Sequence, residues 1–323
     1  MPNKMKALRF HRYGTPDVLS LEEVAVPELS PGEALVRVHA AAVNPSDVKN
    51  VAGVFNASVP RIPGRDYAGT VVAGDPVWVG KTVWGSSAGL GVTRDGSHAE
   101  YLAVQSDSLS EKPAGLSMEQ AASVGVPYLA AWMALRQSAA VEAGETVLIT
   151  GALGAVGRAA TQIAHWSGAR VIGADLSESG SGMEGWIDTR HGDMAAQVKT
   201  LTGGRGADVV VDTVGGPLFE PSVRSLAPAG RQVALTSVGT RRVEFDLGDF
   251  YHNQLRLFGI DTMQLSGPMV AKILNRLAVG FDGGSLTPSP VTPWPLPQAT
   301  DAYTAVGRGR LSTKQVLILT TTA

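Results

Sequence analysis

The clearest chemical signal in the sequence is a glycine turn between an apolar segment and a helix-forming segment. Residues 147–150 are Val-Leu-Ile-Thr, and the turn Gly-Ala-Leu-Gly-Ala-Val-Gly follows at residues 151–157. Gly154 would let the backbone approach a pyrophosphate, and the helix N-terminus would offer unpaired N–H groups to it. The alternative is a glycine turn with a structural role alone. The pattern predicts a dinucleotide site made by Ala152, Leu153, Gly154, Ala155, Val156 and Gly157.

An acidic residue, Asp175, ends the next apolar segment, about 20 residues after the glycine turn. A carboxylate here can accept hydrogen bonds from both ribose hydroxyls of NAD(H), and it repels the 2′-phosphate of NADP(H). No lysine or arginine occurs between Asp175 and Thr189, so only Arg190 could compensate. We therefore expect NAD(P)H as the cofactor, with NADH preferred over NADPH.

Residues that bind transition metals are scarce in this chain. There is no cysteine, which excludes thiolate nucleophiles, iron–sulfur clusters and cysteine-bound zinc. The six histidines show neither H-x-H nor H-E-x-x-H spacing, so we expect no metal. Without a Lewis acid to polarise a carbonyl, a quinone or an activated alkene accepts hydride more readily than a simple ketone does.

Charge and composition exclude several other classes of protein. The 27 basic and 29 acidic residues form no basic stripe, so nucleic acid is not an expected partner. Apolar residues make up 44% of the chain and charged residues 17%, which excludes intrinsic disorder. The charged N-terminus does not suit a signal peptide, and no run of about 18 apolar residues occurs. We expect a cytoplasmic protein without a membrane partner.

The elements that would position these residues fall into two patterns, and 323 residues suffice for two domains. In the first hundred residues, short segments alternate apolar and polar positions, which predicts a barrel-like or sandwich β domain. The expected strands are residues 6–10, 19–24, 33–40, 67–72 and 98–104.

The pattern changes at Ser117, where Ser-x-x-Gln is a capping box for a helix. Apolar strands then alternate with helices, which predicts a parallel doubly wound sheet. The expected strands are 146–150, 170–174, 208–212 and 231–237, and the expected helices are 156–166, 195–201 and 218–226. Beyond them we expect a helix at 268–279, a proline-dense surface connector at 288–297, a helix at 298–306 and a strand at 315–319.

Three further segments carry a family pattern together with the glycine turn. They are Val43-Asn44-Pro45-x-Asp47, the segment Ile-Pro-Gly-Arg-Asp-Tyr-Ala-Gly at residues 62–69, and the segment from Gly206 to Gly216. With them, the chain resembles the medium-chain dehydrogenase/reductase superfamily, specifically its zinc-independent quinone oxidoreductase (zeta-crystallin-like) branch. The resemblance implies an α/β fold in which a Rossmann doubly wound parallel sheet is inserted in a GroES-like β-barrel domain. The implied domains are residues 1–121 plus 262–323 and residues 122–261, with the active site between them.

The resemblance also implies roles for individual residues. Zinc members of the superfamily have cysteine at the position of Asn44, His-Glu at Arg65-Asp66 and a third ligand near Val126. Asn44 would lie beside the nicotinamide and donate a hydrogen bond to the developing oxyanion, or Asn44-Pro45 is only a turn. Lys49 would place positive charge near the oxyanion or would be solvated. Further implied cofactor contacts are Thr213, Ser237, Val238, Gly239 and Ile260.

We therefore expect a zinc-independent NAD(P)H-dependent oxidoreductase whose small-molecule substrate is a quinone or an α,β-unsaturated carbonyl compound. One alternative is a 2-enoyl-thioester reductase, and another is a nucleotide-binding protein with a structural or regulatory role. The resemblance also implies a homodimer that joins edge strands around residues 255–261.

Overall fold

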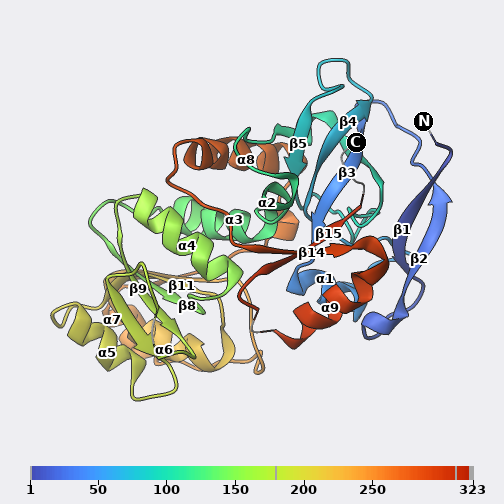
Figure 1. Cartoon of the computed structure of the whole chain (residues 1–323). Coiled ribbons are helices and arrows are strands. Elements are labelled where there is room, and N and C mark those ends of the chain that lie inside the picture. Colours follow the sequence, from blue (N-terminus) through green and yellow to red (C-terminus); the bar gives the residue numbers. More distant parts are fainter. Residues whose placement is uncertain (1, 179, 310, 320–323) are drawn as a thin grey trace. The chain divides into compact units, whose positions relative to one another are not determined.

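The polypeptide is organised in two units, and Figure 1 shows the whole chain with labels on its helices and on many of its strands. The structure is a computed structural model, and it describes residues 2–178, 180–309 and 311–319. Unit 1 combines Met1–Leu129 with Met263–Ala323, and unit 2 is Ala130–Thr262.

Unit 2 is built on a six-stranded sheet in which every strand pair is parallel, in the order β10-β9-β8-β11-β12-β13. The order reverses beside β8, as in a doubly wound fold, so the predicted parallel sheet is confirmed. Strands β8 and β11 are buried at every residue, which explains their apolar sequences. The strands are β8 (Thr146–Thr150), β9 (Arg170–Asp175), β10 (Gly185–Asp188), β11 (Ala207–Asp212), β12 (Leu226–Ala234) and β13 (Arg256–Gly259).

Helices connect the strands of unit 2. The predicted helices appear within a few residues of their expected ends, whereas the short strand β10 and the helix α7 were not predicted. The helices are α4 (Ala155–Trp166), α5 (Met194–Leu201), α6 (Phe219–Arg224) and α7 (Leu247–His252), and a π-helical turn covers Met133–Ser138.

Unit 1 contains a seven-stranded sheet and a separate antiparallel pair, β1 and β2. Strand β3 is the central strand of the sheet, since it pairs with β4, β6 and β15. The strands are β1 (Lys4–Phe10), β2 (Leu19–Ala25), β3 (Glu33–Ala42), β4 (Tyr67–Ala73), β5 (Thr82–Gly85), β6 (Tyr101–Gln105), β7 (Ser110–Glu111), β14 (Val291–Pro295) and β15 (Lys314–Ile318). The helices are α1 (Pro45–Val51), α2 (Met118–Ala122), α3 (Gly125–Trp132), α8 (Gly267–Asp282) and α9 (Ala299–Arg308), of which α3 continues into unit 2.

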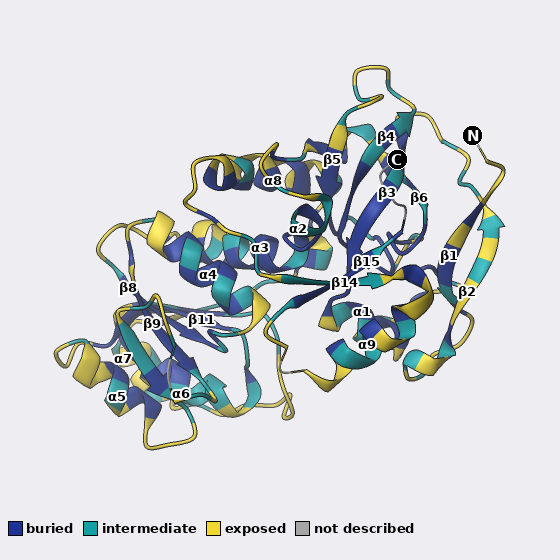
Figure 2. Cartoon of the chain, in the orientation of Figure 1, coloured by how far each residue is buried: buried dark blue, intermediate teal, exposed yellow. Residues whose placement is uncertain are grey.

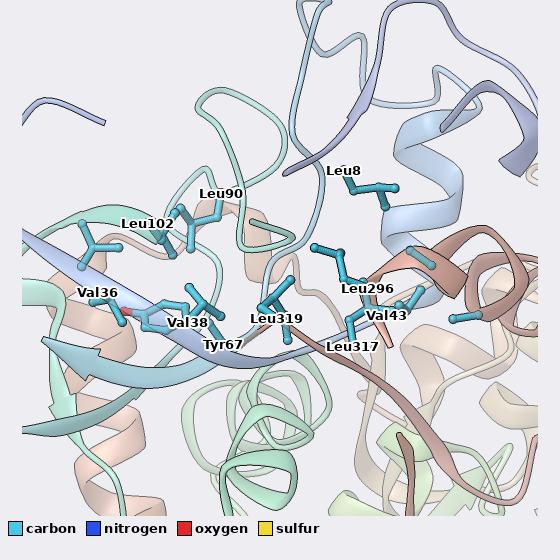
Figure 3. Close-up of a cluster of buried hydrophobic side chains, with 14 of the residues drawn as sticks. Leu8, Val36, Val38, Val43, Tyr67, Leu90, Leu102, Leu296, Leu317 and Leu319 are labelled. Atoms are coloured by element: carbon cyan, nitrogen blue, oxygen red, sulfur yellow. The ribbon is translucent and has the colours of Figure 1, made fainter. Parts of the chain in front are cut away.

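Both ends of the chain contribute to the core of unit 1. Figure 2 shows β3 buried along most of its length. Figure 3 shows side chains from β1 and β3 in one apolar cluster with side chains from the C-terminal segment. Burying these side chains together removes their apolar surface from water, which explains why unit 1 needs both chain ends. The cluster includes Leu8, Val36, Val38, Leu296, Leu317 and Leu319.

The prediction of a surface connector at 288–297 is wrong for Val291–Pro295, which forms β14. This strand pairs in parallel with β15 and lies at the edge of the sheet. Proline has no N–H to donate, but an edge strand leaves alternate N–H positions without a ladder partner. Pro293 and Pro295 are therefore compatible with β14.

Unit 2 begins at Ala130, whereas the sequence predicts a boundary at residue 122. The start of α3 is held within unit 1 by contacts that no local pattern predicts. The Tyr128 hydroxyl donates to the Thr287 carbonyl at 2.7 Å, and the Tyr128 and Phe281 ring centroids are 5.2 Å apart. The capping box that starts α2 is confirmed, because the Ser117 hydroxyl accepts from the Gln120 N–H at 3.2 Å.

Candidate active site

The glycine turn of unit 2 joins β8 to α4. Gly151 has a φ of +62°, which favours glycine. A Cβ on Gly157 would lie 2.3 Å from the Gly151 carbonyl oxygen, so glycine is needed where α4 passes the turn. A Cβ on Gly154 would meet, among the described atoms, just that same oxygen at 3.2 Å. The space beside Gly154 is therefore open to a ligand.

The N-terminus of α4 supplies donors next to this space. Gly154 is the N-cap of the 12-residue helix, and it has no side chain that could bond the first N–H groups. The N–H groups that start a helix have no partner within it, and they carry the positive end of its dipole. These donors at Ala155, Val156 and Gly157 fit the pyrophosphate of a dinucleotide. Ala152 has a structural role, since it is buried and its N–H donates to the Ala174 carbonyl at 3.3 Å.

Asp175 lies directly against the glycine turn. Its Oδ2 accepts from the Leu153 N–H at 2.9 Å, and its Oδ1 accepts from the Leu176 N–H at 2.7 Å. The structure thus brings together the turn and the acidic residue that the sequence analysis pairs. An ionised carboxylate accepts several hydrogen bonds at once, so these bonds still leave sites for ribose hydroxyls.

Arg190 is already paired with carboxylates. Its Nη2 lies 2.6 Å from Asp188 Oδ2, and its Nε lies 2.9 Å from Asp188 Oδ1. Glu178 adds a second carboxylate 3.8 Å from Nη2. A 2′-phosphate would therefore have to compete with the Asp188 carboxylate for this guanidinium.

The remaining predicted cofactor residues follow three neighbouring parallel strands of unit 2. Because the carboxyl ends of parallel strands meet at one edge, these residues share the edge that carries the glycine turn. Thr213 follows β11, Ser237, Val238 and Gly239 follow β12, and Ile260 follows β13.

In unit 1, polar partners enclose the side chain of Asn44, two residues after β3. Its Nδ2 donates to Asp66 Oδ2 at 2.9 Å, and the Lys314 ammonium donates to its Oδ1. Its backbone N–H donates to the Asp47 carboxylate at 2.8 Å where α1 begins. Asn44, Asp47 and Asp66 are at most 1% exposed, and Lys314 is 7% exposed. Asn44-Pro45 therefore starts a helix, and the amide belongs to a buried polar network.

The carboxylate of Asp66 is the centre of this network. Beside the Asn44 amide, it accepts from the Val126 N–H at 3.0 and 3.1 Å and from the Ser86 hydroxyl. A Cβ on Gly125 would lie 2.2 Å from Asp66 Oδ1, so glycine is needed where α3 begins. The network gathers hydrogen-bond donors around an anion.

Two cations and two carboxylates are buried together here: Lys314, Arg65, Asp47 and Asp66. The pKa of Lys314 is lowered, because the effects of burial and of the Arg65 guanidinium outweigh the opposing effects of the two carboxylates. Burial raises the pKa of Asp47 to about 7, against the opposing effects of the Asn44 N–H and Arg65. Opposite charges offset part of each other's desolvation penalty. Lys314 was not among the residues predicted from the sequence, where its signal is a lysine at the start of an apolar C-terminal segment.

Two other polar residues stand outside this network. Lys49 lies on α1 with an exposed side chain, as expected for a solvated lysine. His98 is fully buried, and its Nε2 lies 3.2 Å from the Ala42 carbonyl. Its Nδ1 therefore accepts from the Tyr303 hydroxyl at 2.9 Å. Burial lowers the pKa of His98 to about 4, so it is a neutral packing residue at neutral pH.

Comparison with known proteins identifies the family. The alcohol dehydrogenase GroES-like domain matches residues 30–114, and the zinc-binding dehydrogenase domain matches residues 155–278. A zinc-type alcohol dehydrogenase-like protein of Schizosaccharomyces pombe is 38% identical over 287 residues, covering 87% of this chain and 86% of that protein. The chain belongs to the medium-chain dehydrogenase/reductase family.

Other members of the family match nearly the whole chain. Human quinone oxidoreductase is 29% identical over 325 residues, with 98% of both chains covered. The crystal structure of an NAD-dependent alcohol dehydrogenase is similar with a TM-score of 0.88 and 29% identity, covering 98% of this chain and 100% of that one. These matches confirm a GroES-like domain and a Rossmann-like domain.

Zinc in the names of some relatives implies a metal, which the residues here do not fit. The positions expected for zinc ligands are Asn44, Arg65 and the neighbourhood of Val126, and two of them donate hydrogen bonds to Asp66. A guanidinium and a main-chain N–H have no lone pair for zinc, and the Asn44 oxygen is bonded to an ammonium. Among the described residues, no group of three His, Asp or Glu side chains could hold a metal ion.

None of the helices in the described ranges has the length and apolar character needed to cross a membrane.

Proposed function

We propose that this protein is a zinc-independent NAD(P)H-dependent oxidoreductase that transfers hydride to quinones or α,β-unsaturated carbonyl compounds. The observation that carries the proposal is the Asp66-centred network. At two positions expected for zinc ligands it has hydrogen-bond donors, which are the Asn44 amide and the Val126 N–H. A quinone or an enone needs less help from a Lewis acid than a ketone does. The similarity to human quinone oxidoreductase supports this substrate class.

When bound, a reduced nicotinamide supplies the hydride. The glycine turn and the first N–H groups of α4 would hold its pyrophosphate, and Asp175 would accept hydrogen bonds from the adenosine ribose. We infer a preference for NADH, because Asp175 repels a 2′-phosphate and Asp188 already pairs with Arg190.

An acceptor that gains hydride becomes negatively charged on oxygen, and a neighbouring N–H donor stabilises that charge. Asp66 uses one of the two N–H bonds on Asn44 Nδ2, so the second is the proposed donor. Asn44 is only 1% exposed, so direct contact requires the packing around its amide to open. Solvent supplies the proton that completes the reduction. Lys49 is the second proposed contributor, as an exposed positive charge on α1.

Oxidation of NADH and NADPH after treatment with a chelator tests this proposal. The acceptors are a naphthoquinone, a cyclic enone and a crotonyl thioester, each assayed with and without added zinc. We expect the quinone or the enone to be reduced in the chelated sample, faster with NADH. A strict requirement for zinc would overturn the proposal. Reduction of the thioester alone would instead identify an enoyl-thioester reductase, and tight NADH binding without any turnover would indicate a structural or regulatory protein.

We also propose a homodimer through strand β13. This strand lies at the end of the sheet order of unit 2 and is partly exposed, so its open edge can pair with the same edge of a second copy. Light scattering coupled to size exclusion should give twice the chain mass. Replacing Leu257 by proline should give the chain mass, because proline removes a main-chain donor.

A further inference from the structure

We propose that Lys314 is a positioning residue that fixes the direction of the Asn44 carboxamide. Its expected effect on turnover rests on the proposed function, whereas its effect on the amide itself does not.

The two partners of the Asn44 amide allow only one orientation. An ammonium has donors and no acceptor, and an ionised carboxylate has acceptors and no donor. Lys314 must therefore face Oδ1, and Asp66 must face Nδ2, as the structure shows. Turning the amide by 180° would set its NH2 group against an ammonium and its oxygen against a carboxylate.

The sheet register holds Lys314 in this place. β15 pairs with β3 so that Val316 lies opposite Ala42, and the Val43 N–H donates to the Gln315 carbonyl at 2.9 Å. The Lys314 N–H donates to the Pro290 carbonyl at 2.8 Å on the other side. The backbone on both sides of the lysine is thus fixed next to Asn44.

Burying an ammonium costs free energy unless other charges and hydrogen bonds compensate. Burial and the nearby Arg65 guanidinium disfavour the charged form of Lys314, and the nearby carboxylates of Asp66 and Asp47 favour it. Lys314 and Arg65 thus share this buried region with the carboxyl groups of Asp66 and Asp47, and the hydrogen bond of the Lys314 ammonium is directed at the Asn44 oxygen. Without it, the Asn44 oxygen loses its donor in a dry environment, and Asp66 alone is left to hold the amide.

The activity test compares Lys314→Met, Lys314→Arg, Asn44→Ala and the Asn44→Ala/Lys314→Met double variant. Lys272→Met is the matched control, since Lys272 is an exposed lysine on α8 of the same unit. We expect Lys314→Met to lower kcat about tenfold, the size expected for one hydrogen bond to a charged group. NADH affinity should stay within about twofold, and Lys314→Arg should restore part of kcat because it keeps a cationic donor.

The double variant separates positioning from general stability. If Lys314 acts through the Asn44 amide, adding Lys314→Met to Asn44→Ala should lower kcat by at most about twofold. Losses that multiply in the double variant would overturn the proposal, and so would wild-type kcat in Lys314→Met. If Lys314→Met does not fold, Lys314→Arg provides the test. A change in its NADH affinity as large as the change in its kcat would overturn the proposal.

A second readout does not depend on activity. In protein labelled with 15N-asparagine, the side-chain amide signal that disappears in Asn44→Ala belongs to Asn44. We expect this signal to shift and broaden in Lys314→Met and to keep its position in Lys272→Met. An unchanged signal in Lys314→Met would overturn the positioning role. If no acceptor is reduced but the signal shifts, the proposed function fails while the positioning role stands.

Discussion

The candidate cofactor site of unit 2 and the polar network of unit 1 consist of different kinds of chemical group. The glycine turn occupies residues 151–157 and offers main-chain N–H groups and open space. The network of unit 1 consists mainly of side chains from distant segments, and Asn44 and Lys314 are 270 residues apart. A site made of main-chain groups should be sensitive to added volume, whereas a network of buried charges should be sensitive to lost partners and to pH.

The largest expected effect is on unit 2. Gly154→Val should lower NADH affinity at least about 100-fold, because the side chain fills the open space and displaces charge-assisted hydrogen bonds worth about 1.5–3 kcal/mol each. Calorimetric titration with NADH measures the loss. Gly115→Val is the control, since a Cβ there would have no atom within 4 Å among the described residues. A folded Gly154→Val protein with unchanged affinity would show that the turn does not bind the cofactor.

A smaller effect is expected from truncating the amide in unit 1. Asn44→Ala should lower kcat about 100-fold, the loss typical of one oxyanion donor, while NADH affinity stays within about twofold. Steady-state kinetics with the best acceptor and a cofactor titration measure the two quantities separately. Asn3→Ala, at an exposed position of the same unit, should match the wild type. Wild-type turnover in Asn44→Ala would make Asn44 a structural member of the network.

A side-chain contribution to cofactor choice in unit 2 should be smaller still. Asp175→Ser should narrow the preference for NADH by about fivefold, equivalent to roughly 1 kcal/mol for one unfavourable charge contact. Asp188→Ser should act in the same direction, because it frees Arg190 for a 2′-phosphate. Michaelis curves for NADH and NADPH on each variant measure the ratio. A wild type that favours NADPH tenfold would contradict the prediction and identify Arg190 as the phosphate ligand.

The last expected effect concerns stability, and it is a change in its pH dependence caused by Asp47. Its folded pKa of about 7 lies above the ordinary value of 3.8, so the folded state holds this proton more tightly than the unfolded state does. The contribution of this carboxyl group to the free energy of unfolding is fully present below about pH 4 and is lost as the pH rises through 7. Asp47→Asn keeps an oxygen acceptor for the Asn44 N–H and removes the titration.

Thermal unfolding of both proteins across this pH window tests the assignment. We expect the melting temperature of Asp47→Asn to increase relative to that of the wild type as the pH rises from 4 to 7. His98 contributes the opposite slope in both proteins between pH 4 and 6.5, because its folded pKa is lowered to about 4. A difference between the two melting temperatures that does not change with pH would show that Asp47 is not a titrating member of the network.

Much of the fold is predictable from the sequence because its signals are local. Apolar runs such as β8 and β11 predict buried parallel strands, and the capping box at Ser117 predicts the start of α2. The glycine turn is predictable for the same reason, since strand, turn and helix start are consecutive. The short strand β14 was missed because its prolines are allowed only at a sheet edge, and edges depend on the order of strands.

Local sequence patterns are enough to recognise the dinucleotide motif, the two kinds of secondary-structure pattern and the lack of cysteine ligands. Which side chains surround Asn44 depends instead on how distant segments pack together. The pairing of β15 with β3 brings Lys314 to its amide oxygen, and the start of α3 brings the Val126 N–H to Asp66. Hydrogen bonds and charge pairs act over a few ångströms in space, whereas sequence patterns report neighbours along the chain. Contacts between segments 270 residues apart therefore become visible only when the sheet is assembled.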